Sequence, residues 1–310
     1  MPDLLPVEGI EVKREGTYNV DPSPATSDGV RLARNVWSSM IVDYQFPNRR
    51  TGVVNGSIIP AKNALPRGRF VKLDLYVEIK GAGADVPPEV AELDVATGMP
   101  ETDGSALWTY GPLTSSTKGS CTIYVYSGAK LFKITGCRGR GSLELLAGQL
   151  AVKHYTMWGI LATAPTQTAL AGITYDATEP IAAVNATFTI GGVSFDWLSL
   201  SIDPHGKDCD AFLSGSAVDG IQSFDFMDSD PVVEATLRSL SLATYDVYAL
   251  KNAETTQTMV LTLGPAVAFN RLKILSASVS LLDHNHADSE GATNWRLRWQ
   301  LESGMTWQFD

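Results

Sequence analysis

The chain is poor in several residue types and patterns, and each shortage excludes a class of protein. Its 310 residues include three cysteines, at positions 121, 137 and 209, which form neither a CxxC pair nor an even disulfide framework. We therefore expect reduced thiols in a protein made in a cytoplasm. No apolar run approaches the roughly 20 residues that cross a bilayer, and residues 1–16 lack the regions of a signal peptide. The sequence predicts no membrane insertion.

Basic residues are scarce in the second half. The net charge is −10; residues 1–164 hold 17 Lys/Arg against 16 Asp/Glu, whereas residues 165–310 hold 7 against 18, which gives +1 and −11. A protein that grips nucleic-acid phosphates needs a basic surface, so this balance argues against a nucleic-acid reader. The acidic part is expected to be solvated, or to face a surface where repelling other anions is useful.

Helical periodicity is also scarce, and segments 87–97 and 243–251 are the best short helix candidates. Elsewhere apolar and polar residues alternate, the pattern of strands buried on one face. This pattern predicts strands at 69–80, 121–126, 130–136, 141–146, 151–160, 186–190, 193–202, 233–240, 257–263, 271–282 and 293–301. The sequence predicts a mainly β protein whose length favours two domains, residues 1–164 and 165–310. Residues 43–68 are expected to form a long loop, and residues 161–182 a linker between the domains.

Two stretches of the chain have a similar order of features. Residues 121–160 and residues 258–301 each begin with a short strand and a glycine-containing turn. A basic and apolar strand follows, KLFKITG in the first and RLKILSA in the second, and each stretch ends on a strand with tryptophan near its end. Identities are few, so the similarity can arise by chance between two β-meanders. The matching order and spacing favour a duplicated β domain.

Four short motifs bear on chemistry, and none has the spacing of an active site. His284 and His286 in DHNHADSE are possible metal ligands, but the stretch is expected to be a solvated loop between two strands. The segment DPHGKDCD, 203–210, is expected to turn after a strand, and DFMDSDP, 225–231, lacks the glycine and glutamate of a calcium loop. GCRGRGSL, 136–143, does not lead into a helix, so its glycines indicate a bend or bulge rather than a phosphate site.

Several segments carry a resemblance to one family. They are GTYNVDPSPATSDGV at 16–30, LDLYVEIKGAGADVPP at 73–88, the stretch from STKGSCTIYVY to HYTMWGI at 116–160, and NATFTIGGVSF with LSLSID at 185–203. Together they resemble the major tail proteins, or tail tube proteins, of long-tailed, non-contractile bacteriophages. The resemblance covers most of the chain and departs from the family at 203–216, where PHGKDCDAFLSGS replaces a shorter polar turn.

The resemblance implies a fold, a function and partners. The fold is mainly β, with two tandem tail-tube-like β-sandwich or β-barrel units, each with a long hairpin and a short helix. The function is that of a structural virion protein whose rings stack into a tail tube, a conduit for DNA ejection. Three chains would give a pseudo-six-fold ring if both units form the tube, and six if only one does. The implied partners are copies of the chain and the tape-measure, tail-tip and tail terminator proteins. The resemblance also implies assembly in the host bacterial cytoplasm, no catalysis and no cofactor.

Two groups of candidate residues follow from this interpretation. Contact between rings is assigned to the basic residues of the long loop and its end, Arg49, Arg50, Lys62, Arg67 and Arg69. The residues expected on the lumen and ring hairpins are Tyr124, Tyr126, Lys133, Arg138, Arg140, Glu144, Lys273, Ser276, Ser278, Arg296 and Arg298. Arg138 and Arg140 are two apart on a strand, so they should share a face and could meet an acidic partner surface.

Two other functions remain open on the sequence. A tail terminator or tail-tip ring protein would have the same architecture and form one ring rather than a stack. A metal-dependent hydrolase would use His284, His286 and nearby carboxylates.

Overall fold

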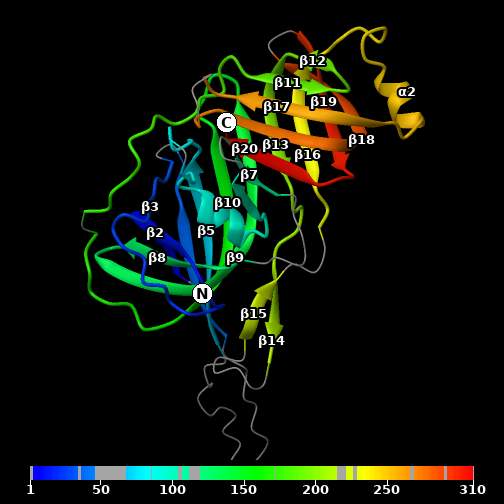
Figure 1. Cartoon of the computed structure of the whole chain (residues 1–310). Helices are drawn as coiled ribbons and strands as arrows, with labels where there is room; N and C mark the ends of the chain where they lie inside the picture. The colour runs from blue at the N-terminus through cyan, green and yellow to red at the C-terminus, as the bar shows by residue number, and fades with distance from the viewer. Residues whose placement is uncertain are drawn as a thin grey trace, which may run out of the picture.

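The computed structural model describes residues 3–33, 36–45, 68–84, 86–103, 107–111, 119–170, 172–214, 221–225, 229–265, 269–289 and 292–309. Within these residues the protein is mainly β, as predicted: antiparallel strands join into one large sheet of 18 strands, and two further strands form a small separate sheet (Figure 1). None of the described helices is long and apolar enough to cross a membrane.

The first half contains ten strands and one helix in the described residues. They are β1 (Asp3–Pro6), β2 (Gly9–Arg14), β3 (Gly29–Val30), β4 (Ser39–Gln45), β5 (Gly68–Glu78), α1 (Ala91–Ala96), β6 (Glu101–Asp103), β7 (Trp108–Tyr110), β8 (Cys121–Ser127), β9 (Lys130–Leu146) and β10 (Val152–Leu161).

The second half also contains ten strands and one helix in the part of the chain that is described. They are β11 (Thr187–Ile190), β12 (Val193–Phe195), β13 (Trp197–Asp203), β14 (Asp210–Leu213), β15 (Ile221–Asp225), β16 (Val232–Arg238), α2 (Val247–Asn252), β17 (Thr256–Leu263), β18 (Leu272–Ser289), β19 (Ala292–Leu301) and β20 (Met305–Phe309).

Alternation of apolar and polar residues explains the central strands. In β5 the side chains of Val71, Leu73 and Leu75 are fully buried, whereas the residues between them are not. The same alternation buries one side of β13, β16 and β19, with Trp299 among the largest buried side chains. Because successive side chains of a strand point to opposite faces, one face of this sheet covers the core and the other is left to polar residues.

Eight strands form a continuous ladder that crosses from one half of the chain to the other. Their order is β4, β5, β10, β9, β13, β16, β19 and β18, and every neighbouring pair is antiparallel. The two halves meet where Leu143 of β9 pairs with Ile202 of β13. They meet again where β20, near the C-terminus, pairs with β7. Among the described residues, named strands of the two halves therefore pair with each other at two places.

The two longest strands each pair in two regions. Residues 130–137 of β9 pair with β8, and its later residues pair with β10 and β13. Residues 272–276 of β18 pair with β17 and β20, and its later residues pair with β19. Gly136 has a positive φ of 62° at the point where the β8 and β10 registers both shift, so the predicted bend at 136–143 is a bulge within one strand. Nearby, a Cβ on Gly139 would lie 2.1 Å from the Thr156 carbonyl oxygen.

Several sequence predictions need correction. The strands predicted at 130–136 and 141–146 are one strand, β9, and the strand predicted at 193–202 is divided into β12 and β13. The stretch 283–289, predicted as a loop, continues β18. Both predicted helices exist but are shorter. α2 begins only after Asp246, because this side chain accepts hydrogen bonds from the backbone N–H groups of Tyr248 and Ala249. The loop predicted at 43–68 lies outside the described residues from 46 to 67, and its first residues belong to β4.

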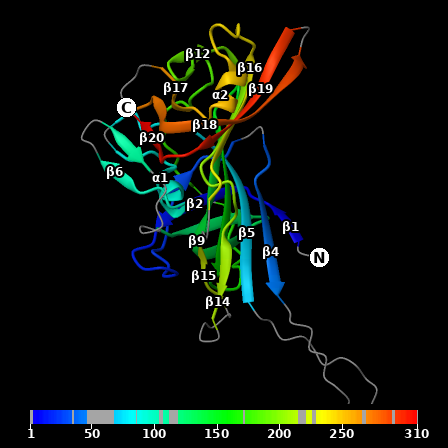
Figure 2. The same cartoon turned by 90° about the vertical axis from the view of Figure 1, so that its right-hand side faces the viewer.

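The β14–β15 hairpin and the β18–β19 hairpin lie at opposite ends of the molecule (Figure 2). Figure 2 shows the β14–β15 hairpin at the same end as the C-terminal end of β4, with the β18–β19 hairpin at the other end. Residues 162–186, the predicted linker, contain no named strand or helix among those described. They are tied to the first half by hydrogen bonds, such as the one from Ile181 N–H to the Ile79 carbonyl (2.8 Å).

Candidate functional site

The main candidate site is the side of the eight-strand ladder opposite to the main core, here called the polar face. Its members share one orientation, opposite to the core residues of the same strands. They are Lys72, Asp74, Tyr76, His154, Thr156, Trp158, Arg138, Arg140, Ser142, Glu144, Ser199, Ser201, Asp203, Glu234, Thr236, Arg296 and Arg298.

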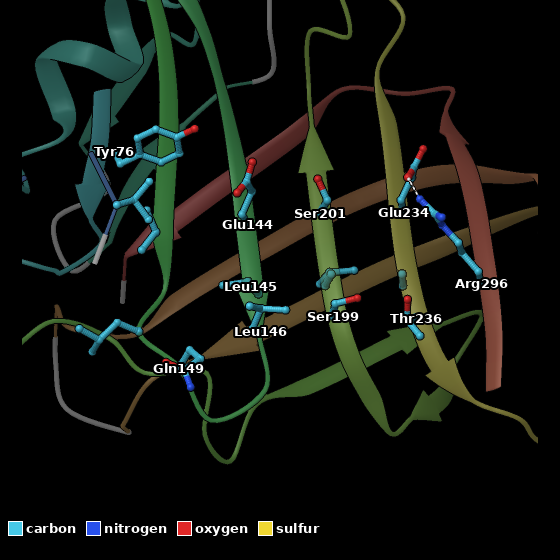
Figure 3. A pocket seen from close by; sticks show the side chains of 15 residues that line it. Tyr76, Glu144, Leu145, Leu146, Gln149, Ser199, Ser201, Glu234, Thr236 and Arg296 are labelled. Atoms are coloured by element: carbon cyan, nitrogen blue, oxygen red, sulfur yellow. Dashed lines mark hydrogen bonds and ion pairs between the residues drawn. The ribbon is translucent and has the colours of Figure 1, made fainter. Parts of the chain in front are cut away.

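Cross-strand register places polar residues of the polar face in rows. One row runs from Glu144 of β9 through Ser201 of β13 and Glu234 of β16 to Arg298 of β19. Figure 3 shows Glu144, Ser201 and Glu234 on successive strands along a hollow of about 740 Å³. The centre of this hollow is lined by hydroxyl side chains, and its ends are lined by charged and apolar ones.

The cations of the polar face have carboxylate partners. Glu234 lies 3.5 Å from Arg296 and 3.4 Å from Arg298. Arg140 pairs with Asp203 at 3.3 Å and with Asp208 at 2.8 Å. These contacts place a carboxylate beside each of these arginines, and Arg296 and Arg298 share one.

The same pairing continues on the first-half strands. Lys72 lies 3.7 Å from Asp74, and His154 lies 3.6 Å from the same carboxylate. The neighbouring His154 ring lowers the pKa of Asp74, and the nearby Lys72 charge lowers it further. Arg138 lies 3.6 Å from Asp225 of β15. The acidic surface expected to meet Arg138 and Arg140 is thus in the same chain, on the segment that follows β13.

The structure brings together five of the residues predicted for the lumen and ring hairpins and separates the other six. Arg138, Arg140, Glu144, Arg296 and Arg298 all lie on the polar face. The remaining six, Tyr124, Tyr126, Lys133, Lys273, Ser276 and Ser278, lie on β8 and on the first parts of β9 and β18.

Those six residues have contacts away from the polar face. The Tyr124 hydroxyl donates to Asp21 (2.7 Å) and accepts from Lys133 (3.0 Å). Tyr126 is buried, and its hydroxyl lies 3.3 Å from Glu11. Ser276 and Ser278 of β18 bond to the turn before β20, and the backbone of Lys273 pairs with both β17 and β20. These six residues alternate with apolar residues along the sequence, as the residues of the polar face do, so the sequence offered no signal to distinguish the two groups.

The residues predicted for contact between rings are mostly beyond the described part of the chain. Arg49, Arg50, Lys62 and Arg67 lie outside the described residues, and Arg69 is described only as a backbone position in β5.

The two histidines of the possible metal site lie on a strand. His284 and His286 face the same side of β18 because they are two apart. The His284 ring packs edge-on against Tyr248 of α2, with centroids 4.8 Å apart, and His286 is exposed. Within the described ranges, no group of three or more His, Cys, Asp or Glu residues could hold a metal ion.

The turn at 203–210 contains a buried histidine that ties the two halves together. The Asp203 carboxylate accepts from the backbone N–H groups of His205 and Gly206, both at 2.9 Å, which forms the predicted turn. The His205 ring is fully buried, and its Nε2 lies 2.8 Å from the Thr97 carbonyl at the end of α1. Burial lowers the pKa of His205, so the neutral ring donates to this carbonyl.

Sequence reasoning missed a buried charged cluster beside α1. Asp94 pairs with Lys153 of β10, and the Tyr155 hydroxyl donates to the same carboxylate oxygen at 2.7 Å. The Lys153 ammonium also lies 3.8 Å from the ring centroid of Trp307 in β20. Burial lowers the pKa of Lys153 and raises that of Tyr155. The sequence signal that could have revealed this cluster is Lys153, a lysine within the mostly apolar predicted strand 151–160.

No protein-family model matches the chain, and no curated protein matches it significantly.

Proposed function

We propose that the chain is a structural subunit that assembles into stacked rings, the tail tube of a long-tailed, non-contractile phage. The observation that carries the proposal is the eight-strand ladder, which has one polar face and spans both halves of the chain. It ends at one side on β18, whose outer side is unpaired in the described residues from residue 281 onward, and at the other side on β4, which is followed by the short edge strand β1. Such a sheet is suited to be one sector of a larger barrel whose inner wall is polar.

The strand pairings support two tandem units. In the first half the pairing order is β4, β5, β10, β9, β8 and β2, and in the second it is β13, β16, β19, β18, β17 and β11. In each half an insertion separates the first two strands of this order. A short helix precedes three consecutive strands that correspond, β8, β9 and β10 in the first half and β17, β18 and β19 in the second. This correspondence matches the similarity between 121–160 and 258–301. On this proposal each unit is a β-sandwich with a long hairpin, and the units meet at the β9–β13 pairing.

The two edges of the ladder support self-association. From residue 281 onward, β18 pairs with β19 alone in the described part of the chain. At the other edge, β1 pairs with β4 alone among the described strands. Exposed edges are templates for another strand, and closing the sheet into a barrel covers them. The ladder contains four strands from each half of the chain, so three chains would supply six such sets, which favours a pseudo-six-fold ring of three chains.

The paired charges of the polar face suit a DNA conduit. DNA that moves through a tube must not adhere to the wall, and affinity for phosphate comes from free lysine and arginine. On the polar face Arg140, Arg296 and Arg298 each lie within 3.5 Å of a carboxylate. The proposed wall therefore offers DNA few unpaired cations.

The proposal includes partners and a place. The tube would be built on a tail-tip protein, its length set by a tape-measure protein and its end closed by a terminator, all in the host bacterial cytoplasm before release in the virion. It assigns the chain no catalysis and no cofactor. A tail terminator or tail-tip ring protein has the same open edges, and stacking separates it from a tube subunit.

Electron microscopy of the purified protein at high concentration tests the proposal. Hollow stacked rings with three or six chains are expected, and isolated rings would favour the terminator or tip alternative. Particles that never close into rings would overturn both.

A proline scan of the β18 edge makes the test sharper. Single prolines are placed at Asp283, His284, Asn285 and His286. Alternate N–H groups of an edge strand point outward, so in each adjacent pair one proline breaks the β19 ladder and the other blocks only the free edge. The outward-blocking variants should stay folded and lose ring closure, with their neighbours as matched controls. Rings formed by all four variants would contradict edge pairing.

A further inference from the structure

Two cysteines lie directly opposite each other in the core of the first half, and the proposed function gives them no role. Cys121 of β8 and Cys137 of β9 are cross-strand partners in the antiparallel pairing of these strands. Both side chains are fully buried in the main core, and their thiols are free. Cys209, the third cysteine, belongs to a different cluster of buried residues. The chain therefore holds one pair of facing thiols and one separate thiol.

A bulge in β9 brings the two cysteines opposite each other. Ile123 of β8 pairs with Ile134 of β9, and a regular continuation of this register would place Gly136 opposite Cys121. The register shifts between Cys121 and Ile123, so Cys137 takes this position instead. Gly136, with its positive φ of 62°, belongs to the bulge. The facing pair is thus a product of the bulge and not of regular strand spacing.

The spacing of directly paired strands fits a disulfide. Directly opposed residues of antiparallel strands have Cα atoms about 4.5–5.5 Å apart, and disulfides join Cα atoms about 4.4–6.8 Å apart. The two side chains also contact each other: burial raises the pKa of the Cys121 thiol, and a hydrogen bond with the Cys137 side chain raises it further. Backbone spacing and side-chain direction therefore both suit a bond between the two sulfur atoms.

A glycine of the neighbouring strand leaves room for the second thiol. A Cβ on Gly159 of β10 would lie 2.6 Å from Sγ of Cys137, so a side chain at position 159 would displace the thiol. The Cys137 thiol also donates a weak hydrogen bond to the Ile134 carbonyl, with S and O atoms 3.5 Å apart. These contacts fix the place of this sulfur atom in the core.

One carboxylate fastens β8 to β9 around the cysteine pair. The Glu15 carboxylate accepts hydrogen bonds from the hydroxyls of Ser120 and Thr122 (2.6 and 2.8 Å), the two residues that flank Cys121. It also accepts one from the backbone N–H of Gly136 (2.7 Å), which directly precedes the second cysteine. Successive side chains of a strand alternate between faces, so this carboxylate holds the strands together on the face opposite to the thiols.

We propose that Cys121 and Cys137 are a latent disulfide, which stays reduced while the chain folds and forms when the folded chain meets hydrogen peroxide. One sulfur, as the thiolate, attacks a peroxide oxygen and becomes a sulfenic acid, and the other oxygen leaves as water. The second sulfur attacks the sulfenic sulfur, so that the S–S bond forms and the S–O bond breaks. The departing hydroxide takes the proton of the second thiol and leaves as water. Two electrons pass from the two thiols to one peroxide, which becomes two waters.

Burial determines when the bond forms. The thiolate is the reactive species, and buried neutral thiols react slowly, so brief contact with an oxidant leaves the pair reduced. A cytoplasm keeps thiols reduced, whereas surroundings outside the cell are oxidising. The bond needs only one folded chain; on the proposed function it would form after the virion leaves its host.

The bond would lock the β8–β9 hairpin at its bulge. Residue 137 is the last residue of β9 that pairs with β8, and the strand continues with β10 as its partner. A disulfide at this point closes a loop of about 15 residues and removes conformational freedom from the unfolded chain. The equilibrium constant of unfolding should therefore fall by about 100-fold on oxidation.

The test uses the variant C209A, whose remaining cysteines are the facing pair. The folded variant is treated with hydrogen peroxide, unfolded, alkylated and digested with trypsin without reductant. The two cysteines fall in tryptic peptides 119–130 and 134–138, so a disulfide joins these peptides. The product should have lost two hydrogen atoms, about 2 Da, and should have no thiol left to alkylate. Urea unfolding of the oxidised and reduced forms measures the change in stability.

The matched controls are C121A/C209A and C137A/C209A, which each keep one thiol of the pair. They should give neither the joined peptides nor the loss of two hydrogen atoms. Circular dichroism establishes that the variants are folded, and the wild type supplies the same peptide map, with Cys209 in a third peptide, if an alanine variant does not fold.

Three outcomes would overturn the latent disulfide. They are two thiols that are still alkylated after the treatment, oxygen adducts on either cysteine in place of the joined peptides, and a disulfide between two chains. Because the measurement needs no ring, failure of the chain to form rings or tubes would refute the proposed function and leave the disulfide standing.

Discussion

Removing either partner of the buried Asp94–Lys153 pair should destabilise the protein strongly, while removing both should cost much less. Both side chains are almost fully buried, and the pair joins α1 to β10. The Lys153 ammonium also contacts the Trp307 ring, which belongs to the C-terminal strand β20. The variants are D94A, K153M and the double variant D94A/K153M.

The magnitude follows from leaving one charge buried without its partner. Such a deletion costs about 3–5 kcal/mol, whereas replacing the whole pair with apolar groups is often close to neutral. In D94A the ammonium of Lys153 and the hydroxyl of Tyr155 lose their acceptor. For a chain of this length a loss of about 4 kcal/mol lowers Tm by about 6 °C. The double variant should recover most of this loss.

Urea unfolding followed by tryptophan fluorescence measures the cycle. The matched control is the exposed pair Asp196–Arg238, with N and O atoms 3.1 Å apart, whose cycle through D196A and R238M should give a coupling below about 1 kcal/mol. If D94A and K153M each cost less than about 1 kcal/mol, or if their effects simply add, the buried pair is not coupled as the structure indicates.

Three further predictions concern pH, DNA and backbone packing. Because burial lowers the pKa of His205, the unfolded chain binds a proton below about pH 6.5 that the folded chain does not. The free energy of unfolding should therefore fall from pH 7 toward pH 5 by up to about 1.4 kcal/mol per pH unit. Urea titrations at pH 5.5 and 7.5 measure this pH dependence; H205N should flatten it, and an unchanged dependence in H205N would contradict the assignment to His205. E234Q removes the one carboxylate that Arg296 and Arg298 share and so adds one net positive charge. The log–log salt dependence of duplex binding to assembled particles should therefore steepen by about 1 between 50 and 200 mM salt, since each phosphate contact contributes roughly 0.9. Fluorescence polarisation measures the slope, E254Q is the control, and equal slopes for E234Q and the wild type would contradict the pairing with Glu234. G139A should lose about 1–3 kcal/mol or more because its Cβ meets the β10 backbone, whereas G16A, with open space around it, should be neutral in thermal melting.

Sequence patterns predicted the strands that have one buried face. In β5, β16 and β19 the apolar residues alternate with polar ones, and this alternation is a local property that a sequence displays directly. The two short helices and the mainly β class followed from the same reasoning. Five of the residues predicted for the lumen and ring hairpins lie on the polar face for the same reason, because they alternate with core residues on β9 and β19.

Patterns failed where a strand has no buried face or where its partner is distant. The end of β18 is rich in polar residues and from residue 281 onward pairs with β19 alone among the described strands, and it was therefore predicted as a loop. The β14–β15 hairpin was missed because β14 is exposed throughout. Tyr124 and Ser276 show the same alternation as Glu144, and only the pairing of their strands with β2, β17 or β20 places them elsewhere.

The sequence by itself determined the fold class, most core strands, the turn at Asp203 and the uneven charge, because each depends on neighbours in the chain. The tertiary structure decided which strands join the halves, that the arginines of the polar face meet acids from distant segments, and that Asp94 and Lys153 share a buried site. These features depend on long-range pairing, whose register is set by the packing of the whole sheet and not by any one segment.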